Sequence, residues 1–436
     1  MLDLQFVLAN PDVVKAAITN KGVRGTAPEK VDRIIELASS VKTFTSEVQL
    51  LRTNRNENAE RIQKASTDER ANIIEEGKKI KEQIAQKESE LSTLESELND
   101  LMSFLPGIPS ADTPIGADET GNTVHHMWGE KPEFDFEPKN HVELMTNLGI
   151  LDIERGVKVS GFRGYFLKGD GAMLEWAVLM YALEKLREKG FEITTPPIIV
   201  KEHVLFGAAQ FPWSPPTDTY RLKSGGVDET GAEVTDQLYL AATAEQPLMA
   251  MYANETLDLT NGPLKLAGLS PCYRQEIGSY SKDVKGIYRV HEFMKVEQVV
   301  IMEPDEEKAE AMHTEILNNA EEILQGLGIH YRVLSMCTGD MGEPQYKKYD
   351  IESWMPGKGS YGETHSASNM RDFQTRRNNI RVKRADGTKA FAYALNNTAI
   401  ALPRFLIALV EQNQTKEGKI RVPQVLQKYL GRELIG

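Results

Sequence analysis

The chain has 436 residues, with 51 Lys or Arg against 64 Asp or Glu and a net charge of −13. Its 40% hydrophobic and 26% charged residues are typical of a globular protein of two or three domains, which excludes the disordered and fibrous classes. No apolar run is long enough to span a membrane, no secretory signal opens the chain, and two cysteines make no zinc pattern. We therefore expect a cytoplasmic protein without zinc.

Helical patterns dominate the first 110 residues. Pro11 follows a capping asparagine and predicts a short helix to about Asn20. Residues 28–105 then repeat apolar residues at steps of three and four, interrupted by the polar segment 64–68. This spacing predicts two long helices that fold back on each other as an antiparallel coiled coil. The sequence thus predicts an N-terminal domain over residues 1–110, with a helical arm at about 28–105.

The periodicity of the arm leaves its partner open. A coiled coil that only dimerises would show the same pattern. The region from Arg52 to Lys87 carries a small net positive charge, which opposes the sign of the whole chain. This charge is a weak indication of contact with a polyanion, and a solvated helix face would look similar.

Residues 111–436 have a mixed α and β pattern. Clusters of strands without regular βαβ alternation predict an α+β domain, in which helices flank an antiparallel sheet. No GxGxxG, Walker A or nucleophile-elbow motif is present, so the common nucleotide-binding and hydrolase folds lose support. The expected helices lie at about 172–189, 306–327 and 404–411, and the expected strands at about 191–200, 238–242, 288–300, 348–353 and 391–394.

Several short motifs in this domain carry chemistry. They are Thr243-Ala244-Glu245, Cys272–Glu276 at the start of a strand, Gly286–Glu297, Glu363-Thr364-His365-Ser366, and Leu395–Thr398 with Arg404 beyond it. Each also has a structural explanation. Arg274 and Glu276 could pair on one strand face, Phe293 could be core, and Glu363 could lie in a surface loop. Thr398 could be a capping or packing residue.

Taken together and in order, these motifs resemble the seryl-tRNA synthetase family of the class II aminoacyl-tRNA synthetases. The helix and strand ending at Pro197 resemble motif 1, Arg274–Glu297 resembles motif 2, and Arg404 at a helix start resembles motif 3. Thr-Ala-Glu, Glu-Thr-His-Ser and Asn-Asn-Thr resemble the seryl branch. The resemblance covers nearly the whole chain.

The resemblance implies ATP-dependent activation of L-serine and its transfer to the 3′ end of tRNA-Ser. It also implies Mg²⁺, a homodimer, an arm that grips the long variable arm of tRNA-Ser, and tRNA-Sec as a second candidate partner. Threonine would be excluded by lack of space, because no editing domain is apparent.

The resemblance also assigns the site residues. The catalytic residues would be Arg274, Arg404 and Glu363. The serine-binding residues would be Thr243, Ala244, Glu245, Arg274, Glu297, Asn396 and Thr398. The ATP-binding residues would be Arg274, Gln275, Glu276, Arg289, Val290, Phe293, Glu363, Thr364, His365, Ser366 and Arg404. Glu363 and Ser366 would hold Mg²⁺.

The sequence departs from the family pattern at a few positions. Gly362 stands where arginine is usual, the segment 207–212 replaces a more usual Gly-Thr-Gly-Gln, and Trp213–Pro216 reads as an insertion. Tyr273 replaces phenylalanine, which is a mild change. Two alternatives remain: an amino-acid:carrier-protein ligase, whose known examples lack the arm, and a non-enzymatic paralogue, which would have lost Arg274, Glu363 or Arg404.

Overall fold

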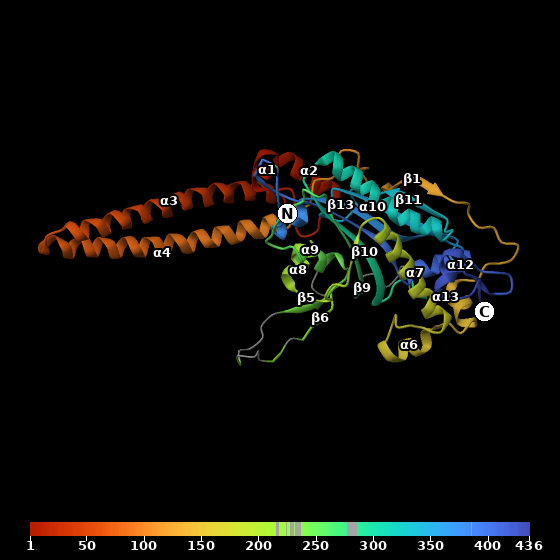
Figure 1. The fold of residues 1–436 in the computed structure, drawn as a ribbon. Coiled ribbons are helices and arrows are strands. Elements are labelled where there is room, and N and C mark those ends of the chain that lie inside the picture. The colour runs from red at the N-terminus through yellow and green to blue at the C-terminus, as the bar shows by residue number, and fades with distance from the viewer. Residues whose placement is uncertain (215–217, 224, 227–230, 232–236, 277–285, 385) are drawn as a thin grey trace. The chain divides into compact units, whose positions relative to one another are not determined.

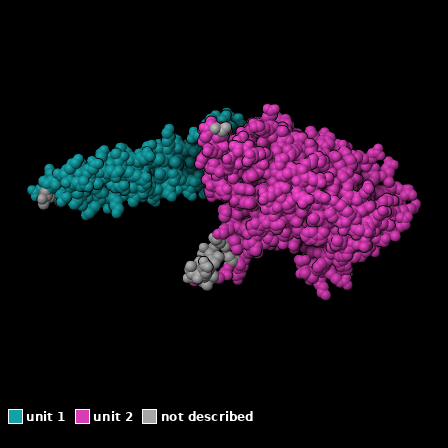
Figure 2. All heavy atoms as spheres, in the orientation of Figure 1, with its two compact units in different colours: residues 1–106 teal, residues 107–436 magenta. Residues whose placement is uncertain are grey.

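The computed structural model describes residues 1–436 except 215–217, 224, 227–230, 232–236, 277–285 and 385. The chain forms two compact units, residues 1–106 and 107–436, which are coloured separately in Figure 2. None of the helices in the described residues is both long and apolar enough for a membrane span.

The first unit is a helical hairpin preceded by two short helices (Figure 1). Its helices are α1 (Leu4–Ala9), α2 (Pro11–Lys21), α3 (Lys30–Lys64) and α4 (Thr67–Ser103). The long helices run antiparallel, because Arg33 near the start of α3 pairs with Glu97 near the end of α4 at 2.9 Å. Close to the turn, Arg61 pairs with Glu76 at 3.0 Å. The predicted antiparallel arm is confirmed.

Local capping explains where α4 begins and where α2 ends. Glu69 accepts hydrogen bonds from the Ser66 amide (3.3 Å) and hydroxyl (2.7 Å), which caps the start of α4. Gly22 adopts a left-handed conformation (φ 57°) and ends α2. Inside the hairpin, Asn58 is 3% exposed, and a Cβ on Gly77 would lie 2.7 Å from its Oδ1. A glycine is therefore needed there for the helices to approach.

The second unit is built on a large sheet. Among the described residues the sheet has eight strands in the order β1-β11-β12-β13-β16-β10-β9-β4, and all neighbours are antiparallel except β4 and β9. The strands are β1 (Thr123–Trp128), β4 (Glu192–Thr194), β9 (Leu264–Tyr273), β10 (Glu292–Met302), β11 (Tyr331–Ser335), β12 (Lys347–Met355), β13 (Ser360–Arg371) and β16 (Tyr393–Ala401). The predicted antiparallel α+β fold is confirmed.

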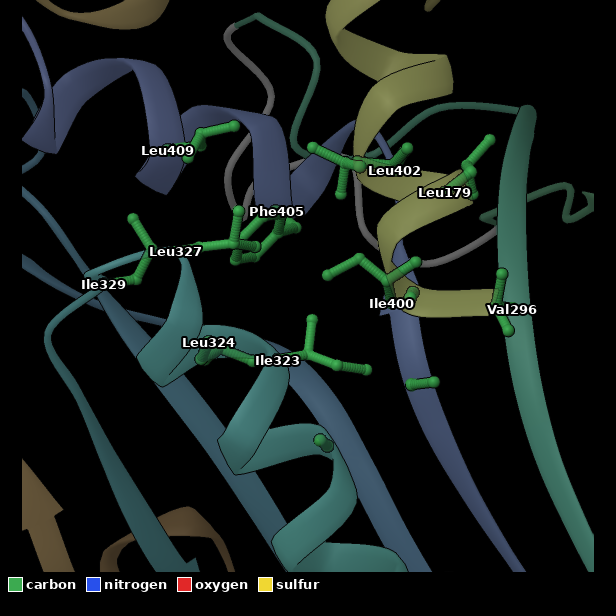
Figure 3. Packing of buried hydrophobic residues seen from close by; sticks show 14 of the residues in the cluster. Leu179, Val296, Ile323, Leu324, Leu327, Ile329, Ile400, Leu402, Phe405 and Leu409 are labelled. Carbon is green, nitrogen blue, oxygen red and sulfur yellow. The ribbon is translucent and has the colours of Figure 1, made fainter. Parts of the chain in front are cut away.

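Alternation along β10 separates the core from the opposite face of the sheet. Val296 and Val300 pack with the helices α7 (Asp170–Glu188), α10 (Glu306–Gly326) and α12 (Arg404–Gln412). Figure 3 shows part of this core, in which Val296 and Ile400 of the sheet lie near Ile323 of α10 and Leu179 of α7. Because successive side chains point to opposite faces, Phe293, Lys295 and Glu297 lie on the other side of β10.

Shorter elements complete the second unit. The helices are η1 (Glu119–Gly121), α5 (His141–Asn147), α6 (Ile153–Ser160), α8 (Glu202–Gly207), α9 (Glu245–Ala250), α11 (Phe373–Arg377) and α13 (Gln424–Leu430). The strands are β2 (Leu151–Asp152), β3 (Phe166–Leu167), β5 (Ile199–Lys201), β6 (Arg221–Leu222), β7 (Leu238–Leu240), β8 (Thr256–Leu257), β14 (Arg381–Lys383), β15 (Lys389–Phe391), β17 (Ile420–Arg421) and β18 (Leu434–Ile435).

Two local predictions were wrong. Cys272 and Tyr273 end a strand rather than start one, and Glu276, three residues beyond, has φ 54°. Strand alternation therefore does not apply to Arg274 and Glu276. The loop explanation for Glu363 also fails, because this residue lies inside β13. Pro215, Pro216 and residues 277–285 of the segment between Arg274 and Glu297 fall outside the described residues.

Candidate functional site

A cavity opens beside β10, β13 and β16, at the start of α12. We call it the Arg404 cavity. It is lined by Arg274, Glu276, Tyr288, Arg289, Val290, Phe293, Lys295, Glu363, Thr364, His365, Ser366, Thr398, Ala401, Leu402, Pro403 and Arg404. Arg274, Glu363 and Thr398, which are far apart in the sequence, thus share one cavity.

Arg404 and Glu363 form the charged centre of this cavity. Arg404 Nη1 donates to a carboxylate oxygen of Glu363 at 3.1 Å and to its backbone carbonyl at 3.2 Å. Burial by itself would raise the pKa of Glu363, but the Arg404 guanidinium and the Lys348 ammonium outweigh it and hold that pKa below its ordinary value. Glu363 is therefore ionised at neutral pH.

Two further arginines, Arg289 and Arg274, line the same cavity. Arg289 Nη1 donates to the Glu276 carboxylate at 2.9 Å. The Arg274 guanidinium lies over the Phe293 ring at 5.3 Å, and Arg274 Nε donates to the Ala242 carbonyl at 3.4 Å. With Arg404, three planar guanidinium groups border one space, an arrangement suited to a polyanionic ligand.

A β-bulge in β13 puts two side chains with oxygen atoms that could bind a metal, those of Glu363 and Ser366, on one face of the strand. Glu363 is opposite Glu352 and His365 is opposite Ile351, so Thr364 is an extra residue in the ladder. In a regular strand, residues three apart point to opposite faces; the bulge places Glu363 and Ser366 on the same face. His365 turns inward, where its ring lies 6.0 Å from that of Phe405.

The side chains of Thr364 and His365 make contacts within the protein. Thr364 Oγ1 donates to the Ile351 carbonyl at 3.2 Å and lies 2.8 Å from His365 Nδ1. Burial lowers the pKa of His365 to about 3, so its ring is neutral. Their predicted role in ATP binding stays a prediction.

A second cavity adjoins the first. We call it the Glu245 cavity. It is lined by Ala208, Ala209, Gln210, Ser214, Asp218, Ala242, Thr243, Glu245, Gln246, Arg274, Glu276, Gly342, Glu343, Pro344 and Met370. Arg274 and Glu276 line both cavities, so a ligand in one would lie beside a ligand in the other.

Glu245 is held by two amide donors. Its Oε1 accepts from Gln374 Nε2 at 2.6 Å and from Asn396 Nδ2 at 2.9 Å. Burial and the nearby charge of Glu297 raise the pKa of Glu245 to about 7. This carboxyl group therefore changes its charge near neutral pH.

Lys295 lies within the Gly286–Glu297 motif, but the sequence predicted no role for it; it lines the Arg404 cavity and contacts Thr243 of the Glu245 cavity. Lys295 is 4% exposed, forms an ion pair with Glu297, and donates to Thr243 Oγ1 at 2.6 Å. Thr398 Oγ1 donates to the same Glu297 carboxylate at 3.3 Å. The alternation Phe293, Lys295, Glu297 on one strand face was the sequence signal that could have revealed Lys295.

The remaining predicted residues have mainly structural contacts. Ala244 is fully buried and precedes α9, while Gln275 Nε2 donates to the Thr219 carbonyl at 3.1 Å. At Gly362, a Cβ would lie 2.9 Å from Met355 and 3.0 Å from Tyr288. These two side chains therefore occupy the space that the usual arginine would need.

Two family models match the chain. The seryl-tRNA synthetase N-terminal domain matches residues 1–109, and the tRNA synthetase class II core domain (G, H, P, S and T) matches residues 220–413. A serine–tRNA ligase of Treponema denticola is 40% identical over 439 residues, covering all of both proteins. One of Deinococcus radiodurans is 40% identical, covering 100% of this chain and 99% of that protein.

Solved structures agree with these matches. The seryl-tRNA synthetase of Pyrococcus horikoshii complexed with ATP is 37% identical, with a TM-score of 0.89 over 100% of this chain and 99% of that one. The cytoplasmic serine–tRNA ligase of Naegleria fowleri in complex with AMP is 30% identical, with a TM-score of 0.86 over 100% and 98%. The chain therefore belongs to the seryl-tRNA synthetase family of class II aminoacyl-tRNA synthetases.

Proposed function

We propose that the chain is a cytoplasmic enzyme that activates L-serine with ATP to seryl-adenylate and transfers serine to the 3′ end of tRNA-Ser. The observation that carries this proposal is the pair of adjoining cavities, one bordered by three arginines and the other by a buried carboxyl group, with Arg274 at their junction. Family membership supports the same reaction.

The Arg404 cavity suits ATP. Activation is an in-line attack of the serine carboxylate on the α-phosphate, two anions that repel each other, so the site must supply cations. Arg274 would bridge the two anions, while Arg404 and Arg289 hold the β- and γ-phosphates. Phe293 would stack against adenine, and Glu276 with the Val290 backbone would contact its edge.

The Glu245 cavity suits the amino acid. Thr243 and Glu245 would receive the serine ammonium, and Asn396 would orient Glu245 through the hydrogen bond described above. Thr398, which lines the adjoining Arg404 cavity, and Glu297, to which it is hydrogen-bonded, would address the serine hydroxyl. A site that binds a hydroxyl in this way rejects alanine, because alanine leaves buried polar groups unpaired.

Mg²⁺ fits the face of β13 that bears Glu363 and Ser366. Among the described residues, no group of three or more His, Cys, Asp or Glu side chains could form a protein cage for a metal. Two oxygen ligands from the protein suffice for Mg²⁺, because this ion keeps several waters and also binds substrate phosphates. When bound, Mg²⁺ would neutralise phosphate charge. Glu363 would contribute a charged oxygen ligand and Ser366 a neutral one.

The arm suits tRNA. Double-helical RNA is recognised mainly by shape and by contacts to phosphates and 2′-hydroxyls, which needs a long polar surface rather than a pocket. Helices α3 and α4, of 35 and 37 residues, offer such a surface. We propose that it binds tRNA-Ser, with tRNA-Sec as a second candidate. The match of residues 1–109 to the family's N-terminal domain disfavours a carrier-protein ligase that lacks an arm.

We also propose a homodimer. Met173, Trp176 and Met180 form a stripe along α7 and are 49%, 48% and 47% exposed, which is unusual for large apolar side chains on a monomer. Light scattering should give twice the chain mass for the wild type. Trp176→Glu should shift the mass towards one chain, because a buried charge in an apolar interface is costly. A wild-type mass equal to one chain would refute the dimer.

Exchange of pyrophosphate into ATP tests the proposed function directly. With the purified protein and a panel of amino acids, serine alone should support rapid exchange, and the same protein should attach serine to tRNA-Ser. Robust exchange with threonine would refute the proposed exclusion by space, and exchange with no amino acid would favour the non-enzymatic alternative.

The raised pKa of Glu245 predicts a pH dependence. As the pH falls below about 7, this carboxyl takes up a proton and loses its attraction for the serine ammonium. The KM for serine should therefore rise by up to about tenfold per pH unit on the acidic side, with the KM for ATP much less affected. Glu245→Gln should give a high KM with little pH dependence. A wild-type KM for serine that stays constant through neutrality would contradict this assignment.

A further inference from the structure

Side chains of helix α11 donate hydrogen bonds to backbone carbonyls in the wall of the Glu245 cavity. Gln374 Nε2 donates to the carbonyl of Ala208 at 2.9 Å. One turn further on, Arg377 Nη1 donates to the carbonyls of Phe206 (2.9 Å) and Phe211 (2.6 Å). Ala208 and its two successors line the cavity. Side chains of one short helix thus fix a segment that borders the proposed amino-acid site.

The approach of this helix is close. The Arg377 guanidinium lies 4.3 Å from the centre of the Phe206 ring and 4.8 Å from that of Trp213. A Cβ on Gly207 would lie 2.2 Å from the Asn378 side chain, so only glycine fits between α8 and the end of α11. The cavity wall is therefore packed against α11 and held at several points along 206–213.

Gln374 is the member of α11 that also reaches into the site. Its side chain is fully buried, and the Nε2 atom that binds Ala208 also donates to Glu245 Oε1 at 2.6 Å. Exchanging the positions of the amide oxygen and nitrogen would place an acceptor against two acceptors, so the orientation is fixed. One amide group thus links the cavity wall to the carboxyl group proposed for the ammonium.

We propose that Gln374 is a positioning residue for amino-acid binding, which holds the Glu245 carboxylate and the Ala208 wall in one fixed geometry around the substrate ammonium. This inference rests on the proposed function of the Glu245 cavity. Gln374 lines neither cavity, so it acts through Glu245 rather than on the substrate.

The charges around Glu245 explain why such a donor matters. Burial and the Glu297 carboxylate oppose ionisation of Glu245, whereas the Gln374 hydrogen bond and the charges of Lys295 and Arg274 favour it. Like Asn396, Gln374 is uncharged, so it stabilises the charged carboxylate without competing for the substrate carboxylate. Its loss should leave Glu245 easier to protonate.

Gln374→Met tests the proposal, because methionine keeps the length of the side chain and removes the donor. The KM for serine in ATP–pyrophosphate exchange should rise roughly tenfold to a hundredfold, since a hydrogen bond to a charged group is lost. The KM for ATP should change by less than about twofold, and the acidic rise of the serine KM should begin at a higher pH. An unchanged serine KM in a folded variant would overturn the inference.

Two further variants separate positioning from general stability. Gln412 also donates through Nε2 to two carbonyls, those of His330 (3.1 Å) and Trp354 (2.8 Å), and lines neither cavity. Gln412→Met should lower the melting temperature but keep the serine KM.

In Gln374→Glu, only the protonated form of the new carboxyl group can donate to Glu245. The serine KM of this variant should therefore approach that of the wild type as the pH is lowered. Equal KM shifts for Gln374→Met and Gln412→Met would refute the proposal, as would a Gln374→Glu variant with no such pH trend. Failure of the wild type to exchange with serine would instead refute the proposed function.

Discussion

Replacing Arg274 by alanine should lower the rate of serine-dependent ATP–pyrophosphate exchange by at least about a thousandfold. Arg274 is the cation that lines both cavities, so it stands where the attacking carboxylate and the α-phosphate would meet. Without it, the two anions repel each other at the moment the bond forms. Arg274→Lys should recover only a small part of the rate, because a lysine cannot bind two oxyanions with a planar fork.

The control for this experiment is Arg332→Ala. The Arg332 guanidinium also lies over an aromatic ring, that of Tyr361 at 4.5 Å, and pairs with Glu352 at 2.6 Å, but it lines neither cavity. This variant should keep its exchange rate within a few-fold. A folded Arg274→Ala protein with near-normal exchange would refute the central role given to Arg274.

Shortening the arm should separate the two half-reactions. A variant that lacks residues 48–86, with a short Gly-Ser link between the shortened helices, keeps the Arg33–Glu97 pair at the base. Serine-dependent exchange should stay within about twofold, because the residues proposed for activation all lie in residues 107–436, whereas charging of tRNA-Ser should fall by more than about a hundredfold.

Salt provides a check on the same assignment. Contacts with phosphates weaken steeply as salt is added, so charging by the full-length protein should fall with ionic strength much more than exchange does. Equal charging by the full-length and shortened proteins would show that the arm does not bind the tRNA.

The sequence predicted the longer helices well, because their signals are local, but it missed short ones such as α11. Pro11 and Gly22 mark the ends of α2, and the three-and-four spacing of apolar residues marks α3 and α4. Motif order grouped Arg274, Glu363 and Arg404, and these three residues line one cavity. The order of the motifs indicates which residues lie close together in the fold, but it does not indicate which contacts they make.

The missed contacts depend on geometry that no local pattern encodes. Lys295 looks like an ordinary charged strand residue until Glu297 and Thr243 are placed beside it. Gln374 acts on Glu245, a residue 129 positions away in the chain, from a helix of only five residues. Glu276 was misassigned because nothing in its neighbours indicates a left-handed backbone.

The bulge in β13 makes the relation between Glu363 and Ser366 depend on how β13 pairs with β12, and not on these two residues alone. If Thr364 were deleted, Glu363 and Ser366 would stand two residues apart, and regular alternation would keep both side chains on one face. If a substitution instead removed the bulge without shortening the chain, Ser366 would turn to the face opposite Glu363. The pair of oxygen ligands should therefore tolerate the loss of the Thr364 codon better than a substitution that straightens the strand.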